Sequence, residues 1–138
     1  MTVGTLAERP LWCIAACAAL AVIAPGSAEA HAAQSVGDYA KHRAADRGWT
    51  GGQWRALQAI VRPESGWDPC AVYPARHDCS YAGTSSCGVP QAQPCPAAWR
   101  GRLWSVRFVQ VRWLLDYIDR RYGDPLHALW FRQAHSYY

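Results

Sequence analysis

Residues 50–67 read TGGQWRALQAIVRPESGW, and this stretch predicts a helix with one buried face that leads to a carboxylate. Thr50 and Gln53 have the spacing of a capping box, with Thr50 as the N-cap. Apolar side chains then recur at helical spacing, at Trp54, Leu57, Ile60 and Val61. We therefore expect a helix over about 51–62 that packs on the rest of the protein through these side chains.

Glu64 follows this helix and is the one glutamate of the chain beyond the first thirty residues. Pro63 cannot donate a backbone hydrogen bond to the carbonyl of Ala59, so we expect the helix to end or kink just before Glu64. Apolar neighbours and the negative end of the helix dipole would raise the pKa of Glu64, as a general acid needs near neutral pH. The alternative interpretation is an exposed residue paired with Arg62 or another arginine.

The first thirty residues have the features of an export signal. Residues 11–24 form an uncharged apolar run, Pro25-Gly26 interrupts it, and Ala28-Glu29-Ala30 has the small-x-small pattern of a cleavage site. We expect cleavage before His31. The apolar run has 14 residues, fewer than the roughly 20 of a spanning helix, so no permanent membrane anchor is expected. The protein is predicted to be secreted.

Residues 31–138 have the length of one small domain and carry a positive net charge. The whole chain has 14 Lys and Arg against 10 Asp and Glu. Without Arg9, Glu8 and Glu29, which lie in the signal, the net charge is +5. Such a charge serves solubility or attraction to a polyanion, and an exported protein meets anionic cell-wall polymers before nucleic acid. No basic run is long enough for a nucleic-acid-binding arm, so no such partner is expected.

Four cysteines remain after cleavage, at Cys70, Cys79, Cys87 and Cys95. In a short secreted domain they indicate two disulfides. Three pairings are possible, and we favour the local one, Cys70–Cys79 with Cys87–Cys95. The gaps of eight, seven and seven residues lack the close ligand pairs of zinc sites, so no metal is expected. Prolines and turn residues fill positions 66–101, which predicts a cross-linked loop region.

Three further helices are predicted, over about 36–47, 105–121 and 125–134. The longest has an apolar stripe that we expect in the core, at Val106, Val109, Trp113, Leu114, Tyr117 and Ile118. Gly123 is expected to end it, and Asp124-Pro125 places an N-cap and a first-turn proline at the start of the last helix. No stretch alternates cleanly as a strand. The predicted fold is mainly α.

Four stretches in order resemble motifs of a known family. They are RGWTGGQW at 47–54, ESGW at 64–67, CGVPQA at 87–92 and, more loosely, RYG at 121–123 with the aromatic tail 128–138. Together they are similar to the lytic transglycosylase-like domains of the soluble lytic transglycosylase and goose-type lysozyme superfamily. The resemblance covers roughly residues 38–138. It implies a small lysozyme-like domain that acts on peptidoglycan without a cofactor.

The resemblance also implies a mechanism with one carboxylate. Glu64 would protonate the leaving oxygen of the MurNAc–GlcNAc β-1,4 bond and then act as a base. The 6-hydroxyl of the substrate would attack the anomeric carbon and leave a 1,6-anhydro sugar. A mature protein whose one glutamate is Glu64 suits that chemistry.

Three further residues are implied as substrate contacts. Ser65 is expected near Glu64 or the acetamido group, and Gln91 is expected to bind substrate or the acid. Their structural alternatives are helix capping for Ser65 and loop structure for Gln91. Tyr137 or Tyr138 matches the late cleft tyrosine of the family; the alternative for these terminal residues is a packing role or a frayed end.

Seven tryptophans lie beyond the signal. Trp67 and Trp99 fall in the loop region, where we expect them to stack on sugar rings. Trp54, Trp113 and Trp130 lie at helical spacing and are expected in the core.

Two other functions compete with this hypothesis. A hydrolytic lysozyme would need a second carboxylate, for which Asp68 and Asp78 are the nearest candidates. A non-catalytic wall-binding or interaction module could use the same fold. We expect a monomer, because nothing in the sequence suggests a coiled coil.

Overall fold

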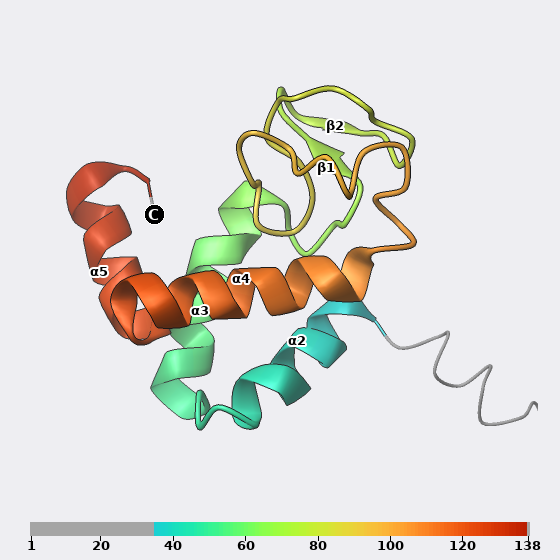
Figure 1. Ribbon diagram of the computed structural model, residues 1–138. Coiled ribbons are helices and arrows are strands. Elements are labelled where there is room, and N and C mark those ends of the chain that lie inside the picture. Colours follow the sequence, from blue (N-terminus) through green and yellow to red (C-terminus); the bar gives the residue numbers. More distant parts are fainter. Residues whose placement is uncertain (1–34, 138) are drawn as a thin grey trace, which may run out of the picture.

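Four helices and one two-stranded antiparallel sheet make up residues 35–137, the part that the computed structural model describes (Figure 1). The elements are α2 (Val36–Ala45), α3 (Gly51–Glu64), β1 (Ala71–Val72), β2 (Arg76–His77), α4 (Arg107–Tyr122) and α5 (Pro125–His135). About half of these residues are helical, so the mainly α prediction is confirmed. The predicted signal peptide, its cleavage site before His31, and Tyr138 lie outside the described residues.

None of the helices in residues 35–137 is long and apolar enough to cross a membrane.

Helix α3 continues through Pro63 and ends at Glu64, two residues beyond the predicted end at about 62. The proline lies in the last turn, where only one backbone hydrogen bond is lost. The turn is then closed beyond it, because the N–H groups of Ser65 and Gly66 both donate to the carbonyl of Val61, at 3.0 and 3.2 Å. The carboxylate therefore extends from a regular helix end.

The capping box predicted at the start of α3 does not form. Thr50 is the N-cap, but its side chain makes no capping hydrogen bond. Gln53 instead accepts a hydrogen bond from the N–H of Leu126 at 3.0 Å, across to the first turn of α5. The side chain that was expected to close its own helix thus joins two helices.

Helix α4 buries Leu114 and Ile118 of the predicted stripe, and Val106, Trp113 and Tyr117 are partly buried against the two cores. Val109 is exposed, whereas the neighbouring Gln110 is fully buried together with Val111, Leu114, Leu115 and Ile118. The Oε1 of Gln110 accepts from the N–H of Val89 at 2.9 Å, and its Nε2 donates to the carbonyls of Pro69 and Leu103 at 3.2 and 2.9 Å. A buried amide whose bonds are satisfied therefore fastens three loop segments to the helix.

Helix α5 begins as predicted. Gly123, with a φ of 81°, ends α4, and the Asp124 side chain accepts from the N–H of His127 at 2.9 Å with Pro125 in the first turn. The helix packs mainly against α3 and also contacts α4. Trp130 is 68% exposed on its outer face, so the prediction that it is a core residue is wrong.

The loop region between α3 and α4 lies beyond the C-terminal end of α3 (Figure 1). Its two disulfides, Cys70–Cys79 and Cys87–Cys95, have the predicted local pairing. The strands β1 and β2, which the sequence did not predict, form a short hairpin inside the first disulfide loop. One apolar cluster lies among the helices and a second surrounds the disulfides. The cross-linked loops therefore have a core of their own.

Candidate active site

Two pockets meet at Glu64 and Gln91, which line both of them. The first, here called the tyrosine pocket, has a volume of about 340 Å³ and is lined by Glu64, Pro90, Gln91, Ala92, Gln93, Trp113, Tyr117, Ser136 and Tyr137. The second, here called the hairpin pocket, has about 590 Å³ and is lined by residues 62–66, 71–73, 75, 76 and 91. In the described part of the chain, Glu64 is the only carboxylate that lines either pocket.

Glu64 is held by an arginine from the far end of the chain. Arg132 of α5 donates from Nη2 to Oε1 of Glu64 at 2.7 Å, and each side chain is only about a quarter exposed. The Nε of Arg132 is buried and has no partner among residues 35–137. An arginine partner was the alternative expected for Glu64, but the pair lies half-buried beside the pockets and not on the open surface.

Ser65 joins the end of α3 to the loop that carries Gln91. Its hydroxyl donates to the carbonyl of Val89 at 2.7 Å and accepts from the N–H of Trp67 at 3.3 Å. Ser65 also lines the hairpin pocket. These hydrogen bonds do not cap the helix with the side chain; they fix where Glu64 lies relative to that loop.

Gln91 lies in a tight loop, and the glycine at position 88 of this loop has no room for a side chain. Gly88 has a φ of 75°, and a Cβ on it would lie 2.5 Å from Oε1 of Gln110. Cys87 and Ala92 exchange backbone hydrogen bonds, which closes the loop. The Nε2 of Gln91 donates to the carbonyls of Ala71 and Gly88, at 3.1 and 3.0 Å. With its nitrogen held in this way, Gln91 has its amide oxygen left to accept a hydrogen bond from a ligand.

The aromatic residues divide differently from the prediction. Within residues 35–137, Trp67 and Trp99 line neither pocket. Trp67 stacks on Trp54 with ring centroids 5.6 Å apart, and Trp99 is 4% exposed with its ring edge-on to Trp113 at 5.7 Å. Tyr137, by contrast, lines the tyrosine pocket as expected of a cleft tyrosine.

Sequence reasoning placed Trp113 and Tyr117 in the core, yet both line the tyrosine pocket. Their rings are stacked, with centroids 5.3 Å apart and planes 5° from parallel. They lie one helical turn apart on α4, which is the same spacing that buried residues have. The periodicity of α4 therefore contained no signal that this face borders a pocket.

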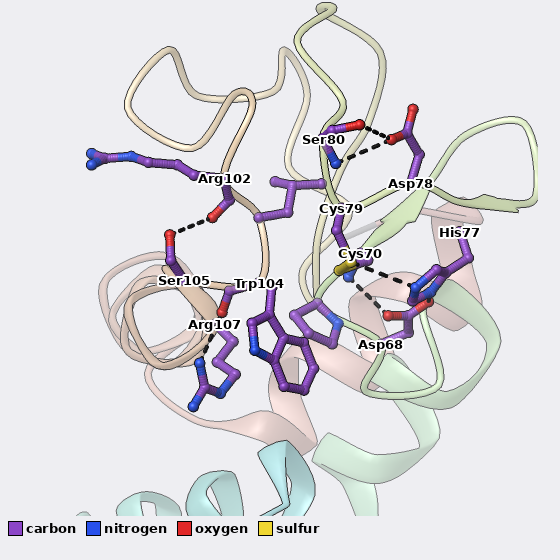
Figure 2. The surroundings of a disulfide bond; sticks show 12 residues. Asp68, Cys70, His77, Asp78, Cys79, Ser80, Arg102, Trp104, Ser105 and Arg107 are labelled. Atoms are coloured by element: carbon purple, nitrogen blue, oxygen red, sulfur yellow. Dashed lines mark hydrogen bonds and ion pairs between the residues drawn. A yellow bond between two sulfur atoms is a disulfide. The ribbon is translucent and has the colours of Figure 1, made fainter. Parts of the chain in front are cut away.

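The two aspartates considered as second carboxylates have other partners (Figure 2). Asp68 accepts from the N–H of Cys70 at 2.8 Å and contacts Nδ1 of His77 at 2.7 Å. Asp78 accepts from the N–H and the hydroxyl of Ser80, at 3.1 and 2.9 Å. Neither aspartate lines a pocket that Glu64 lines.

A possible metal cluster lies at the same place in Figure 2, formed by Cys70, His77 and Cys79. The two sulfurs are bonded to each other in a disulfide. Because a thiolate is the form of cysteine that binds a metal, this cluster does not supply a metal site in its oxidised form.

Asp124 caps the N-terminus of α5, the helix that carries Arg132. Burial disfavours its charged carboxylate, but hydrogen bonds from the backbone and ring of His127 outweigh it and hold the pKa of Asp124 below its ordinary value. At the end of α4, burial is the main cause that raises the pKa of Tyr122. The guanidinium of Arg121 lies 5.5 Å from the Tyr122 ring centre and 5.9 Å from that of Phe131.

Comparisons with protein-family models, with curated proteins and with solved structures found no match to this chain. The family resemblance therefore stays a prediction from the motifs.

Proposed function

We propose that this protein is a secreted lytic transglycosylase with a lysozyme-like fold that cleaves the MurNAc–GlcNAc bond of peptidoglycan. The observation that carries the proposal is the position of Glu64 and Gln91 at the meeting point of two pockets. A glycan strand that fills both pockets would place a glycosidic bond beside the one carboxylate available. The aromatic rings of Trp113, Tyr117 and Tyr137 give the tyrosine pocket surfaces that suit sugar rings.

The chemistry needs only Glu64 as a proton carrier. Protonated Glu64 gives its proton to the glycosidic oxygen as the bond to the anomeric carbon breaks. The resulting carboxylate takes the proton of the MurNAc 6-hydroxyl while that oxygen bonds to the anomeric carbon. The products are a 1,6-anhydro-MurNAc end and a free GlcNAc hydroxyl, and Glu64 is protonated again.

The absence of a second carboxylate at the described pockets favours this reaction over hydrolysis. A hydrolase places two carboxyl groups about 5–10 Å apart across the bond that it cuts. Asp68 and Asp78 are engaged by His77 and Ser80, outside both pockets.

Arg132 has two opposite effects on this cycle. It stabilises the ionised carboxylate that exists between the acid step and the base step. It also opposes the protonated form that begins the reaction, so Arg132 has to move from Glu64 when a sugar enters. The guanidinium has only this hydrogen bond among the described residues, and its Nε is unpartnered, which makes such a release feasible.

The same ion pair supports a second candidate, a wall-binding module without catalysis. If Arg132 keeps Glu64 ionised with ligand bound, the pockets would bind glycan and leave it intact. Release of soluble fragments from peptidoglycan therefore distinguishes catalysis from binding alone.

The test is digestion of purified peptidoglycan by the exported protein, by Glu64→Gln and by Asp78→Asn as a control carboxylate outside the pockets. Soluble fragments are analysed by mass spectrometry. We expect anhydro-muropeptides from the wild type and the control, and none from Glu64→Gln. Reducing-end fragments would indicate hydrolysis. Pull-down by peptidoglycan with no fragments from any protein would support the binding module.

A further inference from the structure

The hairpin pocket carries two arginines whose charges no carboxylate of the described chain neutralises. Arg62 extends from the last turn of α3, Arg76 lies in β2, and both line the pocket. Within residues 35–137 neither forms an ion pair; Arg76 only lies over the Tyr81 ring, 5.0 Å from its centre. Both arginines remain exposed to a ligand.

The nearby acidic groups are already committed. Glu64 borders the pocket but pairs with Arg132, and Asp68 pairs with His77 on the far side of the hairpin disulfide. Elsewhere in the described chain, arginines such as Arg47 meet carboxylates directly, in this case Asp116 and Asp119. The hairpin pocket therefore has a surplus of positive charge and is complementary to an anion.

The rest of the lining indicates what kind of anion. Besides the arginines and Tyr73, the lining includes the small apolar residues Pro63, Ala71, Val72 and Ala75. Such a lining suits short aliphatic side chains, and a guanidinium binds a carboxylate through two parallel hydrogen bonds. A short peptide with small side chains and free carboxylates matches both properties. A sugar without a peptide is neutral and offers no carboxylate to either arginine.

We propose that the hairpin pocket binds the carboxylates of the peptide stem on the glycan, so that the protein prefers stem-bearing strands over bare ones. This inference rests on the proposed function for the path of the glycan past Glu64. Arg62 and Arg76 are specificity-determining residues in this arrangement and take no part in proton transfer. The tyrosine pocket, which has no arginine in its lining, takes the sugar on the other side of the bond.

The test measures binding by calorimetry at physiological salt, so that cleavage is not needed. The probes are a muramyl disaccharide with a free tripeptide, the same compound with its carboxyls amidated, a bare chitin tetrasaccharide, and glycerol phosphate as a wall-phosphate mimic. The proteins are the wild type, Arg62→Gln, Arg76→Gln and Arg120→Gln, an exposed arginine of α4 outside both pockets. We expect amidation, Arg62→Gln and Arg76→Gln each to weaken binding of the tripeptide compound about ten-fold, and Arg120→Gln to change it less than two-fold.

Three binding results would overturn the inference. They are equal binding of the free and amidated compounds, equal weakening by Arg120→Gln and Arg76→Gln, and binding of glycerol phosphate as tight as that of the tripeptide. Failure of the proposed function has a different signature, because the tripeptide compound would then bind as expected while peptidoglycan stays uncut. Equal cleavage of stem-bearing and stem-free glycan would retain the enzyme and reject the stem preference.

Discussion

Arg132 and Glu64 lie 68 residues apart in the chain, yet Nη2 of Arg132 lies 2.7 Å from Oε1 of Glu64. The contact joins the last turn of α3 to the third turn of α5 at the border of both pockets. It ties the side chain of the proposed acid to the C-terminal helix. This pair therefore contributes to the packing of α5 on α3 and also holds the side chain on which the proposed chemistry depends.

A double-mutant cycle measures this pair. Glu64→Gln, Arg132→Gln and the double variant are unfolded in urea, and we expect a coupling free energy of about 1 kcal/mol. The value lies between those of exposed and buried pairs because both side chains are partly screened by solvent. The exposed pair Arg43 and Asp46, at 2.9 Å, is the matched control and should couple by a few tenths of a kcal/mol, about the usual value for such pairs. Equal coupling in the two pairs would contradict the expectation.

Gln110→Ala is expected to lower the free energy of unfolding by about 2–4 kcal/mol. The change removes three hydrogen bonds, leaves the N–H of Val89 unpaired and opens a cavity under the loop that carries Gln91. Chemical denaturation followed by tryptophan fluorescence gives the measurement. Gln133→Ala, on the exposed face of α5, is the control and should change stability by less than about 0.5 kcal/mol. A loss below that of the control would show that the amide is not holding the loop.

Asp124→Asn should reveal a pH-dependent part of the stability of α5. The pKa of Asp124 is lower in the folded protein than its ordinary value near 4, so the charged carboxylate stabilises the fold above that pH. The wild type should exceed the variant by about 0.5–1 kcal/mol at pH 6, and the difference should vanish as pH falls through the lowered pKa. Urea unfolding of both proteins between pH 6 and pH 2.5 tests this. A difference that does not change with pH would refute it.

Removal of the Cys70–Cys79 disulfide, by replacing both residues with alanine, should lower stability by about 2–3 kcal/mol. The hairpin inside that loop supplies Tyr73 and Arg76 to the hairpin pocket, so binding of the tripeptide compound should weaken as well. The comparison variant replaces Cys87 and Cys95, which close a loop of similar length that contains Gln91 but neither arginine of the hairpin pocket. If the comparison variant weakens tripeptide binding more than the hairpin variant does, the hairpin is not the wall that selects the stem.

Local signals in the sequence predicted local features of the fold. Gly123 and Asp124-Pro125 marked the boundary between α4 and α5, and the short gaps between cysteines favoured the observed pairing. The errors occurred where a distant partner decides the outcome. Gln53 bonds Leu126 instead of its own helix end, and Gln110 is buried because three loop groups satisfy its amide.

In the candidate site, too, local motifs predicted some residues and gave no signal for a contact that depends on a distant partner. Glu64 and Gln91 were predicted from their motifs, and both line the two pockets, although their action on a substrate stays a prediction. Arg132 had no motif, and its contact with Glu64 depends on how α5 packs against α3. The periodicity of a helix shows which of its own faces is apolar. It does not predict which side chain of a neighbouring helix contacts that helix.

The two pockets that Gln91 lines differ in the chemistry of their walls. The amide nitrogen of Gln91 is held by two backbone carbonyls, which leaves the oxygen as an acceptor for hydroxyl or N–H donors. Of the two pockets that Gln91 lines, the tyrosine pocket has the stacked aromatic rings and the hairpin pocket has the two guanidinium groups. A polymer with unlike ends would not fit equally well when reversed, so a strand that threads this cleft should do so in one orientation only.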